Sequence, residues 1–181
     1  MKAHRGMRPQ DVLILLKIMA KGSQPWYSKE LAMELFMSAS EVTESLNRSM
    51  IVGLLDPSRK KVMVNAFVDF LIFGLRYVYP AQPGPVVKGV PTSHSAPVLS
   101  GFFKAEDKYV WPDAEGIERG QAIEPLYPTV TKAVKVDAIL YDLLALTDVF
   151  RVGKTREIKV ARELLQKLVY GYQKEIKSHE G

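Results

Sequence analysis

A stretch rich in proline and glycine, residues 80–101, constrains the architecture of this chain more than any other feature. It holds five prolines and three glycines, and proline neither donates a backbone hydrogen bond nor continues a helix. The stretch therefore cannot form one regular element, and it separates an N-terminal helical region from a C-terminal one. Its valines and Leu99 favour an ordered strap on the surface over a loose linker.

The region before the strap predicts three helices, because apolar residues recur there at helical spacing. The first covers 9–22, with Pro9 in its first turn and Gly22 at its end. The second covers 28–36. The third covers 39–51 and follows Ser38, which forms a capping box with Glu41.

Two further elements complete this region. The turn residues 56–58 separate Leu54-Leu55 from an apolar segment at 62–64, which predicts a short hairpin. The segment 65–79 is almost wholly apolar. It predicts a helix that is buried on most sides, in the core or in a subunit interface.

Beyond the strap, residues 102–128 show little periodicity and predict short strands or loops. A broad helical apolar pattern begins at Thr131, is broken at Gly153 and resumes after Thr155, which can cap a last helix. The fold class expected is therefore mainly α, in three parts. These parts are a winged helix-turn-helix at 1–79, the strap with an irregular segment at 80–130, and a C-terminal helical hairpin at 131–181.

Composition narrows the possible functions. The chain has 181 residues and a net charge of +5. Residues 1–80 hold 11 Lys and Arg against 7 Asp and Glu, which is a mild indication of a polyanionic partner. The absence of cysteine excludes disulfides, thiolate zinc sites and cysteine nucleophiles. The apolar run 12–19 is too short for a membrane span and lacks a cleavage site, so we expect a cytoplasmic protein without a membrane partner.

The order helix, helix, tight turn, helix, hairpin is typical of a winged helix-turn-helix. Helix 39–51 would lie in the major groove of double-stranded DNA, and a basic wing at 56–64 would meet the phosphates. Asn47 could bind adenine, and Arg48 could bind guanine or phosphate. The predicted DNA-binding residues are Ser40, Thr43, Asn47, Arg48, Arg59, Lys60 and Lys61.

Three motifs carry a resemblance to a known family. Glu30-Leu31-Ala32, the Ser-x-x-Glu-Val entry at 38–42, and Gly53-Leu54-Leu55 resemble the winged helix-turn-helix of MarR-like bacterial transcriptional regulators. The resemblance implies a DNA-binding regulator that acts as a homodimer. The stretches GLRYVYPA, GVPTSHSAP and LYDLLALTDVFRVGKTRE are similar to uncharacterised bacterial helix-turn-helix proteins, a likeness that implies no activity.

The acidic residues Glu41 and Glu44 would repel phosphates near the expected groove. They favour an alternative, a winged-helix module that binds a protein partner without specific DNA binding. The sequence pattern does not specify an operator sequence or an effector.

Other candidate sites are weaker. His94 lies among hydroxyl residues in Pro-Thr-Ser-His-Ser-Ala-Pro, but neighbours in sequence do not supply the geometry of a catalytic triad. The three histidines lack metal-ligand spacing, and Gly153-Lys154-Thr155 lacks the first glycine of a phosphate loop. We therefore expect no enzyme, no metal and no cofactor.

The sharpest feature of the C-terminal half is a cluster of Arg151, Lys154 and Arg156 near a helix start. Such a cluster could bind an anionic effector or an acidic residue of a partner. The alternative is a capped turn between helices, in which Arg151 or Arg156 pairs with Asp148 or Glu157.

Overall fold

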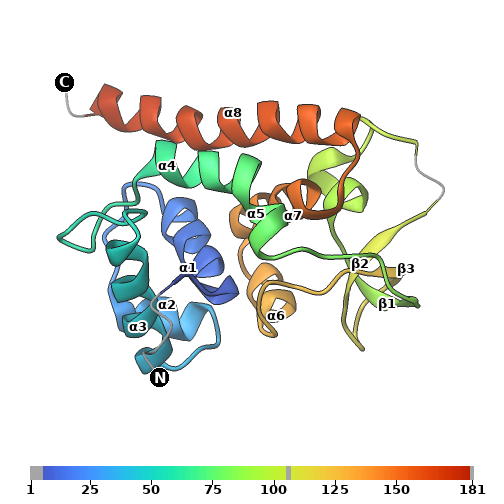
Figure 1. Ribbon diagram of the computed structural model, residues 1–181, viewed down its shortest axis with the longest axis horizontal. Coiled ribbons are helices and arrows are strands. Elements are labelled where there is room, and N and C mark those ends of the chain that lie inside the picture. Colours follow the sequence, from blue (N-terminus) through green and yellow to red (C-terminus); the bar gives the residue numbers. More distant parts are fainter. Residues whose placement is uncertain (1–5, 105–106, 180–181) are drawn as a thin grey trace.

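The computed structural model describes residues 6–104 and 107–179, with side chains described as far as Gly171. The fold is mainly helical, as the sequence predicts, with a small three-stranded sheet. Figure 1 shows α8 lying along one side of the molecule, the first three helices grouped at one end, and the sheet at the other end.

Three helices make up the N-terminal group, close to the predicted ranges. They are α1 (Pro9–Ala20), α2 (Ser28–Glu34) and α3 (Ala39–Ile51). The capping box of α3 is confirmed, since the Glu41 backbone N–H donates to Ser38 Oγ at 3.2 Å and the Ser38 N–H donates to the Glu41 carboxylate at 3.3 Å. The hairpin expected after α3 is present as one antiparallel bridge between Leu55 and Val62.

The predicted apolar helix at 65–79 forms one continuous rod with a wide turn inside it. It comprises α4 (Val64–Asp69), a π-helical turn (Phe70–Gly74) and α5 (Leu75–Val78). Its inner face enters the core through Phe67, Leu71 and Leu75, all fully buried. Its outer face leaves Tyr77 79% exposed, so this helix is buried on one side rather than on most sides.

The proline-rich strap is ordered, as the sequence predicts; most of its residues are exposed or half-buried, and a short part of it enters the core. It contains β1 (Val86–Pro91) and two short 3₁₀ turns (Ser93–Ser95 and Pro97–Leu99). Its residues Thr92, Ser93, Ala96 and Leu99 are each at most 1% exposed. Two of these residues, Ala96 and Leu99, belong to the hydrophobic core.

The irregular segment after the strap supplies β2 (Tyr109–Pro112) and β3 (Glu118–Ala122). Strand β1 pairs antiparallel with both, and β2 and β3 pair in parallel. Strand β1 runs so close to β2 that a Cβ on Gly89 would overlap the carbonyl oxygen of Trp111. Glycine is therefore required at this point of close approach.

The C-terminal hairpin consists of α7 (Ala138–Val152) and α8 (Thr155–His179), preceded by the separate helix α6 (Val130–Val134). The sequence pattern predicted one helix from Thr131, and this was wrong. The helix is interrupted at Asp137. The Asp137 carboxylate accepts the backbone N–H of Leu140 at 2.9 Å and so caps the N-terminus of α7. Val136, whose position fits the apolar spacing of that pattern, is 70% exposed in the break.

A single hydrophobic core joins the N-terminal helices, the strap and the hairpin. Helix α7 lies at its centre, with residues 143–151 all buried. The Lys17 ammonium links three helices, since it lies 2.6 Å from Glu34 of α2 and 2.6 Å from Asp137 at the start of α7. Burial disfavours its charge, but the hydrogen bonds to Asp137 and Glu34 outweigh this and raise the pKa of Lys17.

Within the described residues, no helix is both long enough and apolar enough to cross a membrane.

Candidate nucleic-acid interface

The corner between α2 and α3 sets the direction in which α3 presents its side chains. Phe36 adopts a left-handed conformation with φ 55°, and the Met37 backbone N–H donates to the carbonyl of Ala32 at 2.9 Å. Helix α3 then buries Val42 and Leu46 against the core. Its opposite face is polar and accessible, with Ser40, Thr43 and Glu44 exposed and Asn47 half-buried.

Glu41 does not face solvent freely. Besides capping α3, its carboxylate accepts the Tyr127 hydroxyl at 2.6 Å. The hydrogen bond from Tyr127, followed by that from the Ser38 backbone, lowers the pKa of Glu41. The Glu41 carboxylate is thus engaged in the fold, and Glu44 is the acidic residue that α3 leaves exposed.

Arg48 does not take the position that the sequence suggested. Its guanidinium binds Asp11 of α1 in a bidentate pair, with Nε and Nη2 at 2.9 and 2.6 Å from the two carboxylate oxygens. Asp11 is fully buried and Arg48 is 9% exposed. The hydrogen bond to Asp11 raises the pKa of Arg48. The prediction that Arg48 contacts DNA is therefore corrected, because this side chain holds α3 against α1.

The loop between Leu55 and Val62 is fixed by one carboxylate. Asp56 Oδ1 accepts the backbone N–H groups of Lys60 and Lys61, each at 2.8 Å, and Oδ2 accepts the Ser58 hydroxyl. These bonds, led by that from Ser58, lower the pKa of Asp56 to about 2. Arg59 at the tip is left-handed, with φ 58°. The loop, residues 56–61, protrudes from the body beside α3 (Figure 1).

The loop and α3 are joined by one hydrogen bond. Arg59 Nη1 donates to Asn47 Oδ1 at 2.7 Å, so two residues predicted separately to contact DNA form one surface. Lys61 is exposed, but it lines a cavity with Lys60 and Trp26. The structure therefore brings together Asn47 and Arg59, with Ser40 and Thr43 exposed on the same helix α3.

Lys60 turns toward the connection between α1 and α2. Its Nζ lies 4.9 Å from the ring centroid of Trp26 and 5.6 Å from that of Tyr27, which is the range of a cation–π contact. Trp26 is only 8% exposed, whereas Tyr27 is 64% exposed. No local pattern in the sequence indicates this contact, since Lys60 and Trp26 lie 34 positions apart.

Arg151, Lys154 and Arg156 do not form one anion site. Arg151 is 7% exposed and donates to Asp148 at 2.7 Å and to the carbonyls of Tyr79 and Glu124, each at 2.9 Å. The prediction of an anion or partner site that includes Arg151 is corrected, and its alternative, a pair with Asp148, is confirmed. Lys154 and Arg156 are exposed, and Arg156 lies over the ring of Phe103.

The Asp148 carboxylate is a structural centre that sequence reasoning missed. Besides Arg151, it accepts the Thr92 hydroxyl at 2.9 Å and the indole N–H of Trp111 at 2.6 Å. It therefore joins α7 to the strap and to β2. Of these contacts only the pair with Arg151 was indicated by the sequence, because Asp148 and Arg151 lie three residues apart on one helix.

The hydroxyls around His94 serve the fold in part, since Ser95 Oγ accepts the backbone N–H of Tyr109 at 2.9 Å. The His94 side chain packs on Tyr109, with ring centroids 4.5 Å apart. Among the described residues, no group of three His, Asp or Glu side chains is placed to hold a metal ion.

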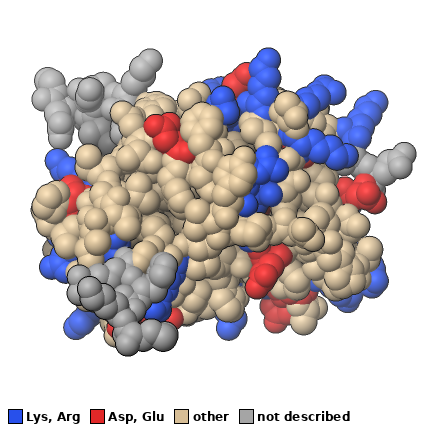
Figure 2. Space-filling view, viewed as in Figure 1, with Lys and Arg blue, Asp and Glu red and all other residues tan. Residues whose placement is uncertain are grey.

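The cations of the surface gather in more than one place. Figure 2 shows many Lys and Arg side chains over the N-terminal half of α8, away from the end that holds α1–α3. The exposed cations of that half are Arg156, Lys159 and Lys167, and the exposed Lys154 directly precedes the helix. Charge alone therefore does not single out the loop and α3 as a contact surface; their geometry does.

Comparison of the chain with protein-family models, with curated proteins and with solved structures gave no match.

Proposed function

We propose that this protein is a cytoplasmic transcriptional regulator that binds double-stranded DNA through a winged helix-turn-helix made of α1–α3 and the loop 56–61. The observation that carries the proposal is the bond between Arg59 of the loop and Asn47 of α3. It joins a rigid cationic loop to the polar face of a helix, which is the combination that groove binding requires.

The residues divide into two roles. In this proposal Ser40, Thr43 and Asn47 contact base edges when α3 lies in a major groove, and an asparagine amide suits adenine. Arg59 and Lys61 contact phosphates, which supplies affinity for any sequence. Arg48 acts through its bond to Asp11, which sets the position of α3.

A second candidate function is protein docking by the same module. Several large apolar side chains on α2 and at the end of α3 are exposed: Met33 (75%), Phe36 (49%), Ile51 (59%) and Val52 (41%). Together with the exposed Glu44, they suit a protein partner better than a phosphate backbone.

The two candidates separate in one binding experiment. The full chain is titrated with labelled fragments from upstream of its own coding region, at two salt concentrations and with excess competitor DNA. The DNA proposal expects tight binding that weakens with salt and survives competition. Absence of binding even at low salt would overturn it and support protein docking.

Charge-neutralising variants test the proposed surface. Arg59→Gln should weaken binding to all sequences alike and lower the slope of log K against log salt by about 1. Lys88→Gln, an exposed lysine of β1, is the matched control and should leave the slope unchanged. Equal slopes for the two variants would contradict a phosphate contact by Arg59.

We also propose a homodimer, since two-fold symmetry matches palindromic operators. The accessible face of the helix at 64–78 supports it. Phe73, Tyr77 and Val78 are 60%, 79% and 52% exposed there, and apolar side chains that lie together on a surface are typical of an interface.

A further inference from the structure

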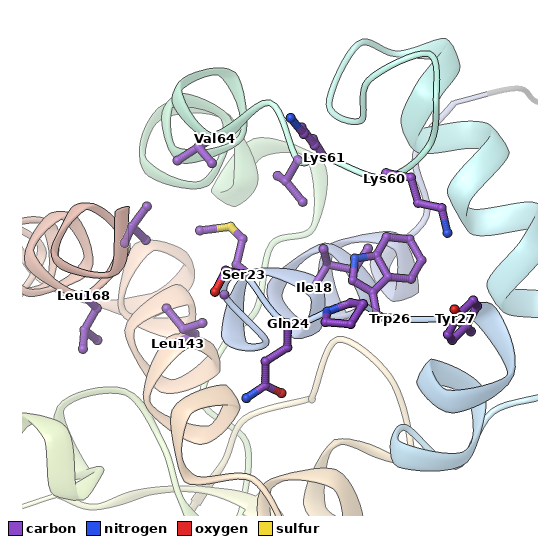
Figure 3. A pocket seen from close by; sticks show the side chains of 15 residues that line it. Ile18, Ser23, Gln24, Trp26, Tyr27, Lys60, Lys61, Val64, Leu143 and Leu168 are labelled. Atoms are coloured by element: carbon purple, nitrogen blue, oxygen red, sulfur yellow. The ribbon is translucent and has the colours of Figure 1, made fainter. Parts of the chain in front are cut away.

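Positively charged side chains meet aromatic rings at two ends of the molecule. At one end Lys60 lies over Trp26, and both line a cavity between the loop 56–61 and the connection between α1 and α2 (Figure 3). At the other end Arg156, in the first turn of α8, lies over Phe103, with its guanidinium carbon 6.0 Å from the ring centroid. The first place belongs to the module already described, so the second is the one without an assigned role.

The aromatic pair Phe102–Phe103 stands on an ordered turn. The Phe102 backbone N–H donates to the Leu99 carbonyl at 3.2 Å, and Gly101 within this turn is left-handed, with φ 86°. Phe103 packs against the core, and its ring centroid lies 6.4 Å from that of Phe102. Phe102 is 47% exposed, so it presents an accessible ring on a fixed base.

The two segments that meet at this pair carry four exposed cations, which are Lys104, Lys154, Arg156 and Lys159. Among the residues with described side chains, none of the four forms an ion pair. The one carboxylate of these segments, that of Glu157, is turned inward, since its side chain is 13% exposed and it accepts the Lys154 backbone N–H at 2.9 Å. The surface of residues 102–104 and 154–159, here called the α8 surface, is therefore cationic (Figure 2).

Cations beside an accessible ring suit a single-stranded nucleic acid. Phosphates complement the cations, and an unpaired base can stack on an aromatic face. A duplex stacks its bases on one another, so it offers phosphates but no free base face to Phe102. A lipid surface would instead need a protruding apolar side chain, whereas Phe103 is held against the core and about half of Phe102 is covered.

We propose that the α8 surface binds single-stranded nucleic acid, with its four cations against phosphates and a base stacked on Phe102. This role goes beyond the duplex binding proposed above and uses none of the residues of α3 or of the loop 56–61. It also uses none of the apolar residues proposed for the homodimer. Single-stranded DNA and RNA share the chemistry that this surface would recognise, so each serves as a probe.

The first test is fluorescence anisotropy of the full chain at low salt, with labelled oligodeoxythymidylate and oligouridylate of about 15 nucleotides, near the upper site size of one binding module. At least one strand should bind, and more weakly as salt rises; the tighter one identifies the class of strand. No binding of either strand would overturn the proposal. A labelled duplex measured in parallel keeps the two proposals apart, because duplex binding without single-strand binding contradicts this one alone.

Two substitutions of Phe102 test the ring. Phe102→Leu keeps an apolar side chain but removes the aromatic face, so the affinity for the single strand should fall about tenfold. Phe102→Tyr keeps the face and should bind within about twofold of the natural chain. Circular dichroism shows whether both variants fold. Equal affinities for the two variants would exclude stacking on Phe102 and overturn the proposal.

The charge is tested by Lys159→Gln, which should lower the slope of log K against log salt for the single strand by about 0.7, since one phosphate contact is lost. Arg59→Gln in the loop 56–61 and Lys88→Gln in β1 should leave that slope unchanged. An unchanged slope in Lys159→Gln would contradict the phosphate contact.

Vesicles of phosphatidylcholine and phosphatidylglycerol provide the last arm. Sedimentation of the natural chain with these vesicles, its loss in Lys159→Gln, and no binding of either oligonucleotide would assign the α8 surface to a membrane and overturn the proposal. Oligonucleotide binding without sedimentation is the result expected here.

Discussion

At the scale of the residue, the Asp11–Arg48 pair shows how one buried contact fixes the position of a whole helix. Asp11 is fully buried in α1, and besides Arg48 it accepts the backbone N–H of Arg8 at 2.8 Å. Both charges are removed from water, so each depends on the other for compensation. The orientation of α3 therefore depends on a side chain 37 positions away in the sequence.

We predict that Asp11→Asn lowers the free energy of unfolding by about 3–5 kcal/mol, since it removes the buried counter-charge of the Arg48 guanidinium. Urea denaturation followed by circular dichroism measures the change. Glu44→Gln is the control, because Glu44 lies 3.7 Å from Arg48 but is largely exposed, and we expect a change within about 0.5 kcal/mol. Equal effects from the two variants would refute the role given to the buried pair.

Asp56 predicts a pH dependence of the loop. Its pKa in the folded protein is about 2, below the ordinary 3.8, so its stabilising bonds are fully present above the ordinary pKa. They are lost as pH falls through the folded value. The backbone amide signals of Lys60 and Lys61, followed by NMR, should stay constant from neutral pH down to the ordinary pKa and move below it. A midpoint at or above 3.8 would contradict this, and Asp56→Asn should abolish the transition.

At the scale of the element, the corner between α7 and α8 depends on a residue without a side chain. A Cβ on Gly153 would lie 2.5 Å from the carbonyl oxygen of Val149. The last turn of α7 therefore leaves no room for a Cβ at this position. Glu157 secures the same corner, since its carboxylate accepts the Lys154 backbone N–H at 2.9 Å.

Gly153→Ala should lower the free energy of unfolding by about 1–3 kcal/mol, because the new methyl group overpacks the corner. Gly171→Ala is the matched control in the same hairpin. It lies in α8 with nothing near its Cβ position, so this substitution should stabilise the protein by about 0.5–1 kcal/mol. Thermal denaturation of both variants should therefore give shifts of opposite sign.

Helices were predictable from the sequence and the sheet was not, for a physical reason. Helical periodicity and caps are local, as Ser38 and Glu41 show for α3. Strands β1 and β2 are short, with six and four residues. They pair across a long loop, so the pairing leaves no pattern within a short stretch of sequence. The break at Asp137 was missed because the apolar spacing continues through it.

The candidate site was predictable in part for the same reason. The accessible residues of α3 follow from helical periodicity, which placed Ser40, Thr43 and Asn47 outward. Periodicity does not reveal that Arg48 meets Asp11 or that Lys60 meets Trp26, because those contacts depend on how helices pack. Arg151 was recognisable as a partner of Asp148 because the two are three residues apart on one helix.

At the scale of the whole molecule, one core runs through all three segments that the sequence divides. It takes in buried Leu13 of α1, Leu99 of the strap and Leu165 of α8. A chain with one core is expected to unfold as one cooperative unit.

We predict that the two ends of the molecule unfold together. Trp26 reports on the end that holds α1–α3, and Trp111 reports on the sheet. Urea transitions followed by fluorescence in Trp26→Phe and Trp111→Phe should each coincide with the circular dichroism transition of the same variant. Separate midpoints within one variant would instead indicate independently folding parts.

The homodimer proposal is also tested at this scale. Light scattering coupled to size exclusion should give twice the chain mass at micromolar concentration, and Tyr77→Glu should shift the protein toward monomer, since it puts a charge into the proposed apolar interface. Val86→Glu, an exposed apolar residue of β1, is the control and should leave the mass unchanged. A monomeric natural chain would overturn the proposal.

The mutual pairing of β1, β2 and β3 has a consequence for the behaviour of the protein in concentrated solution. Each strand pairs with both of the others, each over part of its length. An open sheet would instead end in strands whose unpaired N–H and C=O groups can recruit a strand from another chain, which is a common route to aggregation. Because each strand pairs with both of the others, the three-stranded sheet has no strand with one edge unpaired along its whole length, so fewer of those groups are left to pair with another chain.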